Sequence, residues 1–262
     1  MKTIAARLVL AAGGMAAGAS GSAQAQATHM MMPEGTYEMV FGVGLQRTFF
    51  SQSEGGARSV LVPALEVHWC NGVFADVSTD EATLGMHLSG DPMLNFGVQV
   101  SANGRDQRAD TPGQRGGVAL QAGGFVNWNA ANNISVGAAL MAGGGIDGGG
   151  LIAHLRARVY HRIVPHHGAR FAAGLAVADR TWQQGYFGVT PAQAANSGDP
   201  VYRAGAGLVN VYGDVEWQWQ PANKYMLMTG ARLSRLAAIP AASPLTGKRE
   251  RLSVRTTLTY RF

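Results

Sequence analysis

The chain has 262 residues, of which 14% are charged, and its formal net charge is +5. This mildly basic balance gives no footprint of nucleic-acid binding, and a single cysteine, Cys70, excludes an intramolecular disulfide and a cluster of thiolate metal ligands. After the first 25 residues no run of about 18 apolar residues occurs, which excludes a transmembrane helix, whereas 36 glycines and frequent alternation favour strands.

Residues 1–25, "MKTIAARLVLAAGGMAAGASGSAQA", predict a secretory signal peptide. A short basic start is followed by a weakly apolar stretch and by an Ala-x-Ala cleavage site that ends at Ala25, and a cut after Ala27 is also allowed. The apolar stretch is too short and too rich in Gly and Ala to span a bilayer. Residues 26–35 are then expected to form a periplasmic lead-in to the folded domain.

Twelve later segments alternate apolar and polar residues with the period of two that is typical of strands. Many of them reach the about 9 to 11 residues that a tilted strand needs to cross a bilayer. The sequence therefore predicts an all-β fold, a transmembrane antiparallel β-barrel of about 12 strands over residues 36–262. The predicted strands cover residues 36–50, 58–69, 72–79, 82–89, 93–105, 116–128, 133–145, 151–163, 169–183, 204–219, 224–237 and 248–262.

The connections between these segments alternate in length. One set is short: "CNG" at 70–72, "GDP" at 90–92, "NAANN" at 129–133, "PHHGA" at 165–169 and "PANK" at 221–224. The other set is longer, apart from a turn at 80–81, and includes "GYFGVTPAQAANSGDPVYR". Outer-membrane barrels have short periplasmic turns and longer extracellular loops. The pattern therefore places the protein in the cell outer membrane, and the even number of strands puts both termini of the chain in the periplasm.

Two predicted strands illustrate the expected division into faces. One carries Leu151, Ala153, Leu155, Ala157, Val159 and Ile163 opposite His154, Arg156, Arg158, Tyr160 and Arg162. The other carries Val209, Val211, Val215, Trp217 and Trp219 opposite Asn210, Tyr212, Asp214, Glu216 and Gln218. Trp217 and Trp219 fall at the periplasmic end, where an aromatic girdle is expected. Alternation alone does not say which face is inside, but the leader, the loop lengths and the girdle together favour apolar residues towards lipid.

The last twelve residues, "RLSVRTTLTYRF", predict the closing strand of the barrel. Its last strand must pair with its first, because unpaired backbone groups in lipid cost several kcal/mol each. One face of this segment is apolar and ends in Tyr260 and Phe262. The pair resembles the C-terminal signal of bacterial outer-membrane proteins, which implies that the barrel-assembly machinery recognises Tyr260 and Phe262.

A narrower resemblance lies in "GYFGVTPAQAANSGDPVYRAGAGL", residues 185–208. This stretch, the following hairpin "YMLMTGARLSRL", the tetrapeptide "ASPL" and the closing aromatic strand resemble the MipA/OmpV family, which includes the MltA-interacting protein. The family commonly has an aspartate before Ser-Pro, where this chain has Ala242. The resemblance implies a scaffold or interaction protein of the cell envelope that joins a lytic transglycosylase to a peptidoglycan synthase.

The residues expected inside the barrel carry slightly more positive than negative charge. Arginine-lined pores favour anions, so one interpretation is a small anion-preferring pore. The other is a plugged interior in which the arginines pair with the acids, since long side chains fill much of a twelve-strand lumen. The candidate lumen charges are Arg156, Arg158, Arg162, Arg232, Arg251, Arg255, Asp214 and Glu216, together with Arg105, Glu38, Glu66 and Asp76.

A lipid-acting enzyme of the outer membrane is a weaker alternative, because residues that could carry catalysis are sparse. His154 lies near the extracellular end of its predicted strand and could act as a base, but no recognisable serine nucleophile motif accompanies it. His166 and His167 share one predicted turn and supply too few ligands for a metal. The sequence therefore predicts a protein that is not an enzyme and has no cofactor or metal site. Its expected partners include outer-membrane lipid but not nucleic acid. The two resemblances add the assembly machinery, a lytic transglycosylase and a peptidoglycan synthase.

Overall fold

The computed structural model describes residues 35–50, 58–78, 81–104, 118–144, 149–247 and 249–262. The predicted signal peptide, nearly all of the predicted lead-in and the predicted lumen residue Arg105 lie outside these ranges. Among the described residues, no helix is long and apolar enough to cross a membrane.

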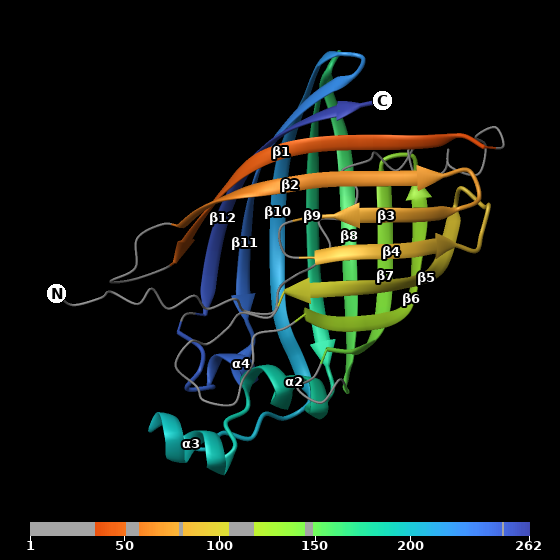
Figure 1. Ribbon diagram of the computed structural model, residues 1–262. Coiled ribbons are helices and arrows are strands. Elements are labelled where there is room, and N and C mark those ends of the chain that lie inside the picture. The colour runs from red at the N-terminus through yellow and green to blue at the C-terminus, as the bar shows by residue number, and fades with distance from the viewer. Residues whose placement is uncertain (1–34, 51–57, 79–80, 105–117, 145–148, 248) are drawn as a thin grey trace.

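Twelve antiparallel strands close into one barrel, in which β12 pairs with β1 (Figure 1). The predicted fold class and strand number are therefore confirmed. We call the end that carries the β2–β3, β4–β5, β6–β7, β8–β9 and β10–β11 connections the short-turn end, and the opposite end the long-loop end. The strands are β1 Tyr37–Phe50, β2 Arg58–Trp69, β3 Val73–Val77, β4 Glu81–His87, β5 Leu94–Gly104, β6 Val118–Ala131, β7 Ile134–Gly143, β8 Leu151–Val164, β9 His167–Ala178, β10 Gly207–Ala222, β11 Tyr225–Leu236 and β12 Glu250–Arg261.

The seam between β1 and β12 closes the barrel. Its register runs from the pair Val40 and Arg261 to the pair Phe50 and Arg251. Only glycine fits at position 44 without a steric clash, because a Cβ there would lie 2.5 Å from the Thr257 hydroxyl and from the backbone oxygen of Thr256. At the short-turn end the N–H of Phe262 donates to the carbonyl of Met39 at 3.0 Å, so β12 stays paired to its last residue.

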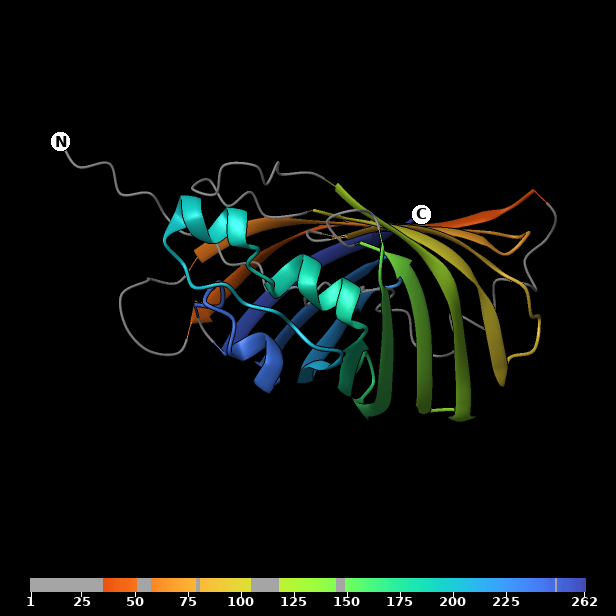
Figure 2. The ribbon, with the colours of Figure 1, turned by 90° about the horizontal axis from the view of Figure 1, so that it is seen from below.

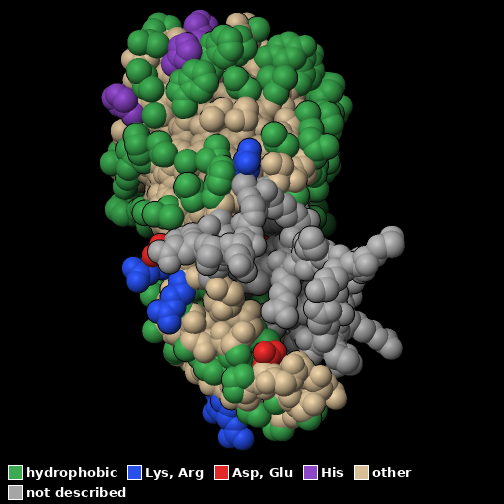
Figure 3. Space-filling view, turned by 90° about the vertical axis from the view of Figure 1, so that its left-hand side faces the viewer, with side chains coloured by type: hydrophobic (Ala, Val, Ile, Leu, Met, Phe, Trp, Pro, Cys, Tyr) green, Lys and Arg blue, Asp and Glu red, His purple; other side chains and the backbone are tan. Residues whose placement is uncertain are grey.

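Apolar side chains point outward from the barrel and polar side chains point inward. Leu61 is 74% exposed, whereas inward-facing Ser101 and Thr257 are 1% and 4% exposed. In the view of Figure 3, hydrophobic side chains gather over the upper part of the surface and most Lys and Arg side chains lie in its lower half. This arrangement is the reverse of a soluble barrel, and it gives lipid an apolar surface.

Val209 departs from the predicted faces. It was predicted to share the outward face of β10, but it is fully buried. The register between β10 and β9 shifts between Leu208 and Asn210, and this bulge turns Val209 inward. Regular alternation resumes with Val211 outward and Tyr212 inward.

The predicted strand over residues 169–183 was too long. β9 ends at Ala178, and helix α2, Arg180–Phe187, follows it. The cause is local: the Asp179 side chain accepts a hydrogen bond from the N–H of Trp182 at 2.7 Å, which caps the helix and stops the strand.

The connection between β9 and β10 includes residues 185–203, which were predicted as one long extracellular loop, and it is partly helical. Helix α3, Pro191–Ser197, begins with a capping box between Thr190 and Gln193. Helix α4, Ala238–Ala241, lies in the connection between β11 and β12. Figures 1 and 2 show α2, α3 and α4 gathered at the long-loop end of the barrel.

Aromatic side chains ring the short-turn end. The rings of Tyr260 and Phe262 lie 4.8 Å apart, and Tyr225 packs 5.0 Å from Tyr260. Trp217 and Trp219 stack with each other at 6.3 Å and are both more than one third exposed. Such a belt fits the level of lipid headgroups, where a ring with one wet edge is favoured.

We expect Gly44→Val to prevent closure of the barrel, because its side chain would overlap the backbone of β12. The measurement is heat-modifiability, the shift in electrophoretic mobility between unboiled and boiled protein. Gly213→Val is the matched control, since an added Cβ there meets its nearest atom at 3.9 Å on the outward face. If the Gly44→Val protein runs as a folded barrel as fully as the control does, the seam is looser than the structure indicates.

Candidate functional site

Six arginines point into the barrel from the wall formed by β8 to β12. The six are Arg156, Arg158, Arg170, Arg232, Arg251 and Arg255. Among the described residues of these strands, two acids share their face, Asp214 and Glu216. Arg162, which was also predicted for the lumen, has the same parity but is exposed near the short-turn end of β8.

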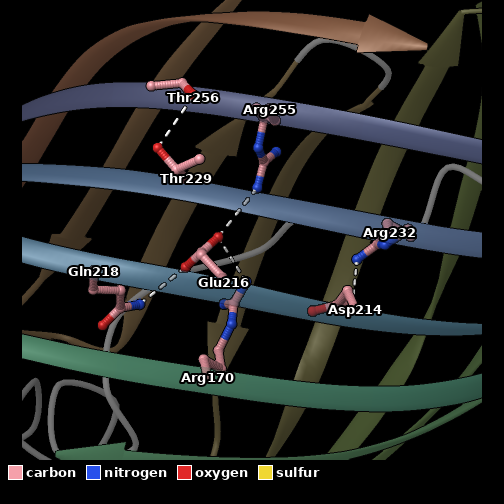
Figure 4. A network of polar contacts seen from close by, with 8 residues as sticks. All are labelled: Arg170, Asp214, Glu216, Gln218, Thr229, Arg232, Arg255 and Thr256. Atoms are coloured by element: carbon pink, nitrogen blue, oxygen red, sulfur yellow. Dashed lines mark hydrogen bonds and ion pairs between the residues drawn. The ribbon is translucent and has the colours of Figure 1, made fainter. Parts of the chain in front are cut away.

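Glu216 is the centre of an ion-pair network on this wall (Figure 4). Its Oε2 atom lies 3.0 Å from Nη2 of Arg170 and 3.8 Å from Nη2 of Arg255. Its Oε1 atom accepts a hydrogen bond from Gln218 Nε2 at 3.0 Å. Glu216 is 4% exposed, so these partners replace the water that a carboxylate would otherwise need.

Gly230 makes the contact between Arg255 and Glu216 sterically possible. It lies on β11, between the two strands that carry these residues, and pairs with both of them in the register. A Cβ at Gly230 would lie 3.1 Å from the Cβ of Glu216. The missing side chain therefore leaves the path along which Arg255 reaches across β11.

Arg170 was absent from the predicted lumen charges. It lies on the same face of β9 as Ala172 and Gly174, so its alternation was a usable signal. Its partner Glu216 is 46 residues away, and no local pattern connects the two.

A second ion pair joins neighbouring strands beside the first. Arg232 Nη2 on β11 donates to Asp214 Oδ2 on β10 at 3.0 Å. The guanidinium carbon of Arg232 also lies 4.7 Å from the ring centroid of Tyr212, within the range of a cation–π contact. Arg232 is therefore fixed by a charge and by a ring at the same time.

The opposite wall, formed by β2 to β6, carries acids, histidines and aromatic rings. The imidazole of His68 contacts the Glu66 carboxylate at 2.5 Å, and Glu66 pairs with Asp76 in the register of β2 and β3. His87 packs against Phe74 and Phe125 with ring centroids 4.8 and 5.4 Å apart.

His87 is held in place by a hydrogen bond between its Nδ1 and Asn95 Oδ1, 2.7 Å long. His68 and His87 are 5% and 7% exposed, so this part of the lumen is covered by its own side chains. Neither histidine was predicted to lie in the lumen, since each belongs to a different strand and only the barrel brings them together.

The two walls differ in their charged side chains. The six arginines lie on β8 to β12, and the acids Glu66, Asp76 and Glu81 lie on the inward face of β2 to β4. Because β3 and β9 are six strands apart in a barrel of twelve, these walls face each other.

Helix α2 covers the long-loop end of the arginine wall. Trp182 and Phe187 are 2% and 4% exposed and pack in one cluster with Ile152 of β8, Val209 of β10 and Leu236 of β11. Gln183, fully buried, donates through Nε2 to the carbonyl of Gly207 at 3.0 Å. The helix is thus anchored by both apolar packing and a hydrogen bond.

The Ser-Pro segment that follows α4 ties the cap together. The hydroxyl of Ser243 donates to the carbonyl of Phe187 at 2.6 Å and accepts from the N–H of Leu245 at 3.2 Å. The hydroxyl of Tyr202 donates to the carbonyl of Ile239 at 2.6 Å. The chain therefore achieves this linkage with Ala242 where an aspartate is common in the resembled family.

The histidines considered for chemistry, and His161 of β8, are spread over the barrel. His154 faces inward below α2, His161 is exposed on the outer face, and His166 occupies the β8–β9 turn with a φ of 65°. His167 stacks on Trp217 at 5.6 Å. Within the described ranges, no group of three or more His, Cys, Asp or Glu side chains is arranged to hold a metal ion.

A closed twelve-stranded barrel with an apolar exterior, a charged interior and an aromatic belt is a transmembrane β-barrel of the outer membrane. The chain belongs to the outer-membrane family described as MltA-interacting protein MipA, which matches residues 39–262. The family resemblance found in the sequence is thereby confirmed. No curated protein matches the sequence.

Solved structures with a similar course of the chain include the NanC porin, with 10% identity, a TM-score of 0.49, and coverage of 84% of this chain and 98% of that one. An outer-membrane channel from Pseudomonas putida F1 has 10% identity, a TM-score of 0.47, and coverage of 88% and 97%. The KdgM porin has 6% identity, a TM-score of 0.43, and coverage of 84% and 99%.

We expect Glu216→Gln to destabilise the barrel by about 3 to 5 kcal/mol, because it removes a buried carboxylate and leaves two partly buried arginines without it. Glu250→Gln is the matched control. The Glu250 carboxylate lies 3.6 Å from Arg235 with both side chains largely exposed, so its loss should cost about 0 to 1 kcal/mol. Denaturant unfolding in lipid vesicles measures the loss of stability in each variant. Equal unfolding midpoints for the two variants would contradict the central role of Glu216.

Proposed function

We propose that this protein is an interaction protein of the cell envelope, which holds a lytic transglycosylase at the outer membrane and joins it to a peptidoglycan synthase. The observation that carries the proposal is the family match over residues 39–262, since the family is described by its interaction with MltA. A protein fixed in the outer membrane keeps a bound hydrolase close to the peptidoglycan below it.

The lumen supports this proposal because its side chains are largely paired and covered. Glu216, Gln218 and Thr259 are all less than 9% exposed although they face inward. A wide water-filled channel would leave such groups wet. An interior whose charged groups are held in ion pairs, closed by a helical cap, suits a rigid platform.

The orientation belongs to the proposal as well. In it the long-loop end with α2, α3 and α4 faces the outside of the cell, and the short-turn end faces the periplasm and the partners. Tyr260 and Phe262 serve as the assembly signal for insertion. Phe262 is 62% exposed at the end of β12, where another protein can reach it.

An anion-preferring pore is the second candidate, and the excess of arginine on one wall favours it. Six arginines share that wall with two acids. Both acids are already in ion pairs, so the wall keeps a positive potential that attracts anions.

A photocrosslinking residue at Ala222 should capture a lytic transglycosylase in intact envelopes, because Ala222 is exposed at the short-turn end. The same residue at Asn196, exposed on α3, is the matched control and should capture none. Epitopes at the two positions test the orientation independently, since only the one at Asn196 should be accessible on whole cells. Capture of the hydrolase from Asn196, or labelling of Ala222 on whole cells, would reverse the proposed orientation.

Replacement of Arg156 and Arg158 by glutamine separates the two candidates, because both lie inside the barrel away from the short-turn end. A pore should lose anion preference in planar bilayers, because charge near a narrow constriction is poorly screened. An interaction protein that works through its short-turn end should keep its captured partner. The variant is first checked for heat-modifiability. A folded variant that loses its partner while conductance stays unchanged would contradict both candidates.

A further inference from the structure

Several buried polar atoms beneath helix α2 lack hydrogen-bond partners. They are Nδ1 of His154, Oδ1 of Asn210, the hydroxyl of Tyr212 and Oε1 of Gln183, and none has a partner within the described part of the chain. Asn210, Tyr212 and Gln183 are 5%, 7% and 0% exposed. Buried polar groups are normally satisfied, so such a concentration points to a bound polar molecule.

The strand register places these groups side by side. His154 on β8 and Asn210 on β10 both pair with Ala176 of β9, so the three form one row across the wall. Arg156 and Tyr212 both pair with Gly174 and form the next row. Neighbouring strands lie about 4.8 Å apart, so each row spans roughly 10 Å, the size of a small solute.

Tyr212 reaches across β9 towards β8. A Cβ at Gly174 would lie 2.5 Å from the Tyr212 hydroxyl, so the phenol occupies the space that a side chain at Gly174 would fill. The hydroxyl therefore lies over β9, between its own strand and the strand that carries Arg156. Gln183 lies above these rows. Helix α2, which carries it, packs on Ile152, and Nε2 of Gln183 donates to the carbonyl of Gly207.

The charge of this region is positive. Arg156 and Arg158 belong to the same inward face of β8. The nearest acid on the wall, Asp214, is bound to Arg232 at 3.0 Å, and Glu216 is bound to Arg170 at 3.0 Å. The region thus combines guanidinium groups with a phenol donor, an imidazole and two amide acceptors, which suits an anion that also carries hydroxyl groups.

We propose that the lumen beneath α2 is a binding site for a small hydroxylated carboxylate, of the chemical class of sugar acids. Arg156 binds the carboxylate. The hydroxyl groups of the ligand donate to Asn210 Oδ1 and Gln183 Oε1 and accept from the Tyr212 hydroxyl. The site is independent of the proposed partner at the short-turn end, since it lies at the other end of the barrel.

Calorimetry on the barrel in lipid nanodiscs tests the site with three probes at equal ionic strength: glucuronate, acetate and glucose. Glucuronate carries both recognised groups, acetate only the carboxylate and glucose only the hydroxyls. We expect saturable binding of glucuronate and at least tenfold weaker binding of the other two. Equal binding of acetate and glucuronate, or no binding of glucuronate, overturns the proposal.

Tyr212→Phe removes only the unpaired hydroxyl and keeps the ring that packs on Arg232. It should weaken glucuronate binding about fivefold to tenfold, the usual worth of one hydrogen bond. Tyr160→Phe is the matched control, because Tyr160 crosses Gly168 in the same manner nearer the short-turn end and outside the site. Arg156→Gln should abolish binding. If Tyr212→Phe binds as well as Tyr160→Phe, the proposed site is wrong, and this comparison holds even if Arg156→Gln fails to fold.

Discussion

Every backbone N–H and C=O group in the hydrocarbon region of a bilayer must have a protein partner, because no water is present to satisfy it. This requirement forces β12 to pair with β1, and the chain supports the pairing with specific residues. Gly44 leaves room for the β12 backbone, the Phe262 N–H bonds Met39, and an ion pair at 2.8 Å joins Arg261 to Glu38. A barrel without this seam would expose two open edges to lipid.

Closure has a second consequence, which is that the polar residues lie together inside. Half of every strand points inward, and the enclosed side chains must satisfy one another. Glu216 shows how this is done, with arginines from β9 and β12 and an amide from its own strand. Such pairs are weak evidence for extra stability, because desolvation cancels much of the attraction, but breaking them is costly.

The segment that carried the family resemblance, residues 185–208, has a structural explanation here. Its residues build the end of α2, all of α3 and the stretch that Tyr202 fixes to α4. The cap closes over the arginine wall, and the unpaired polar groups lie directly beneath it. A scaffold role at the short-turn end and a solute site at the long-loop end are compatible, since they use opposite ends of one rigid barrel.

The sequence by itself determined the strand number, the closing strand and the outward faces, because each depends on local alternation and on loop length. It also placed Arg232, Asp214 and Glu216 on inward faces. It did not find the α2 cap, where one hydrogen bond from the Trp182 N–H to the Asp179 side chain ended the strand early, or the bulge that buries Val209. Only the tertiary structure decided that Glu216 meets Arg170 across 46 residues and that His68 packs near His87, because ion pairs and ring contacts depend on which strands closure makes neighbours.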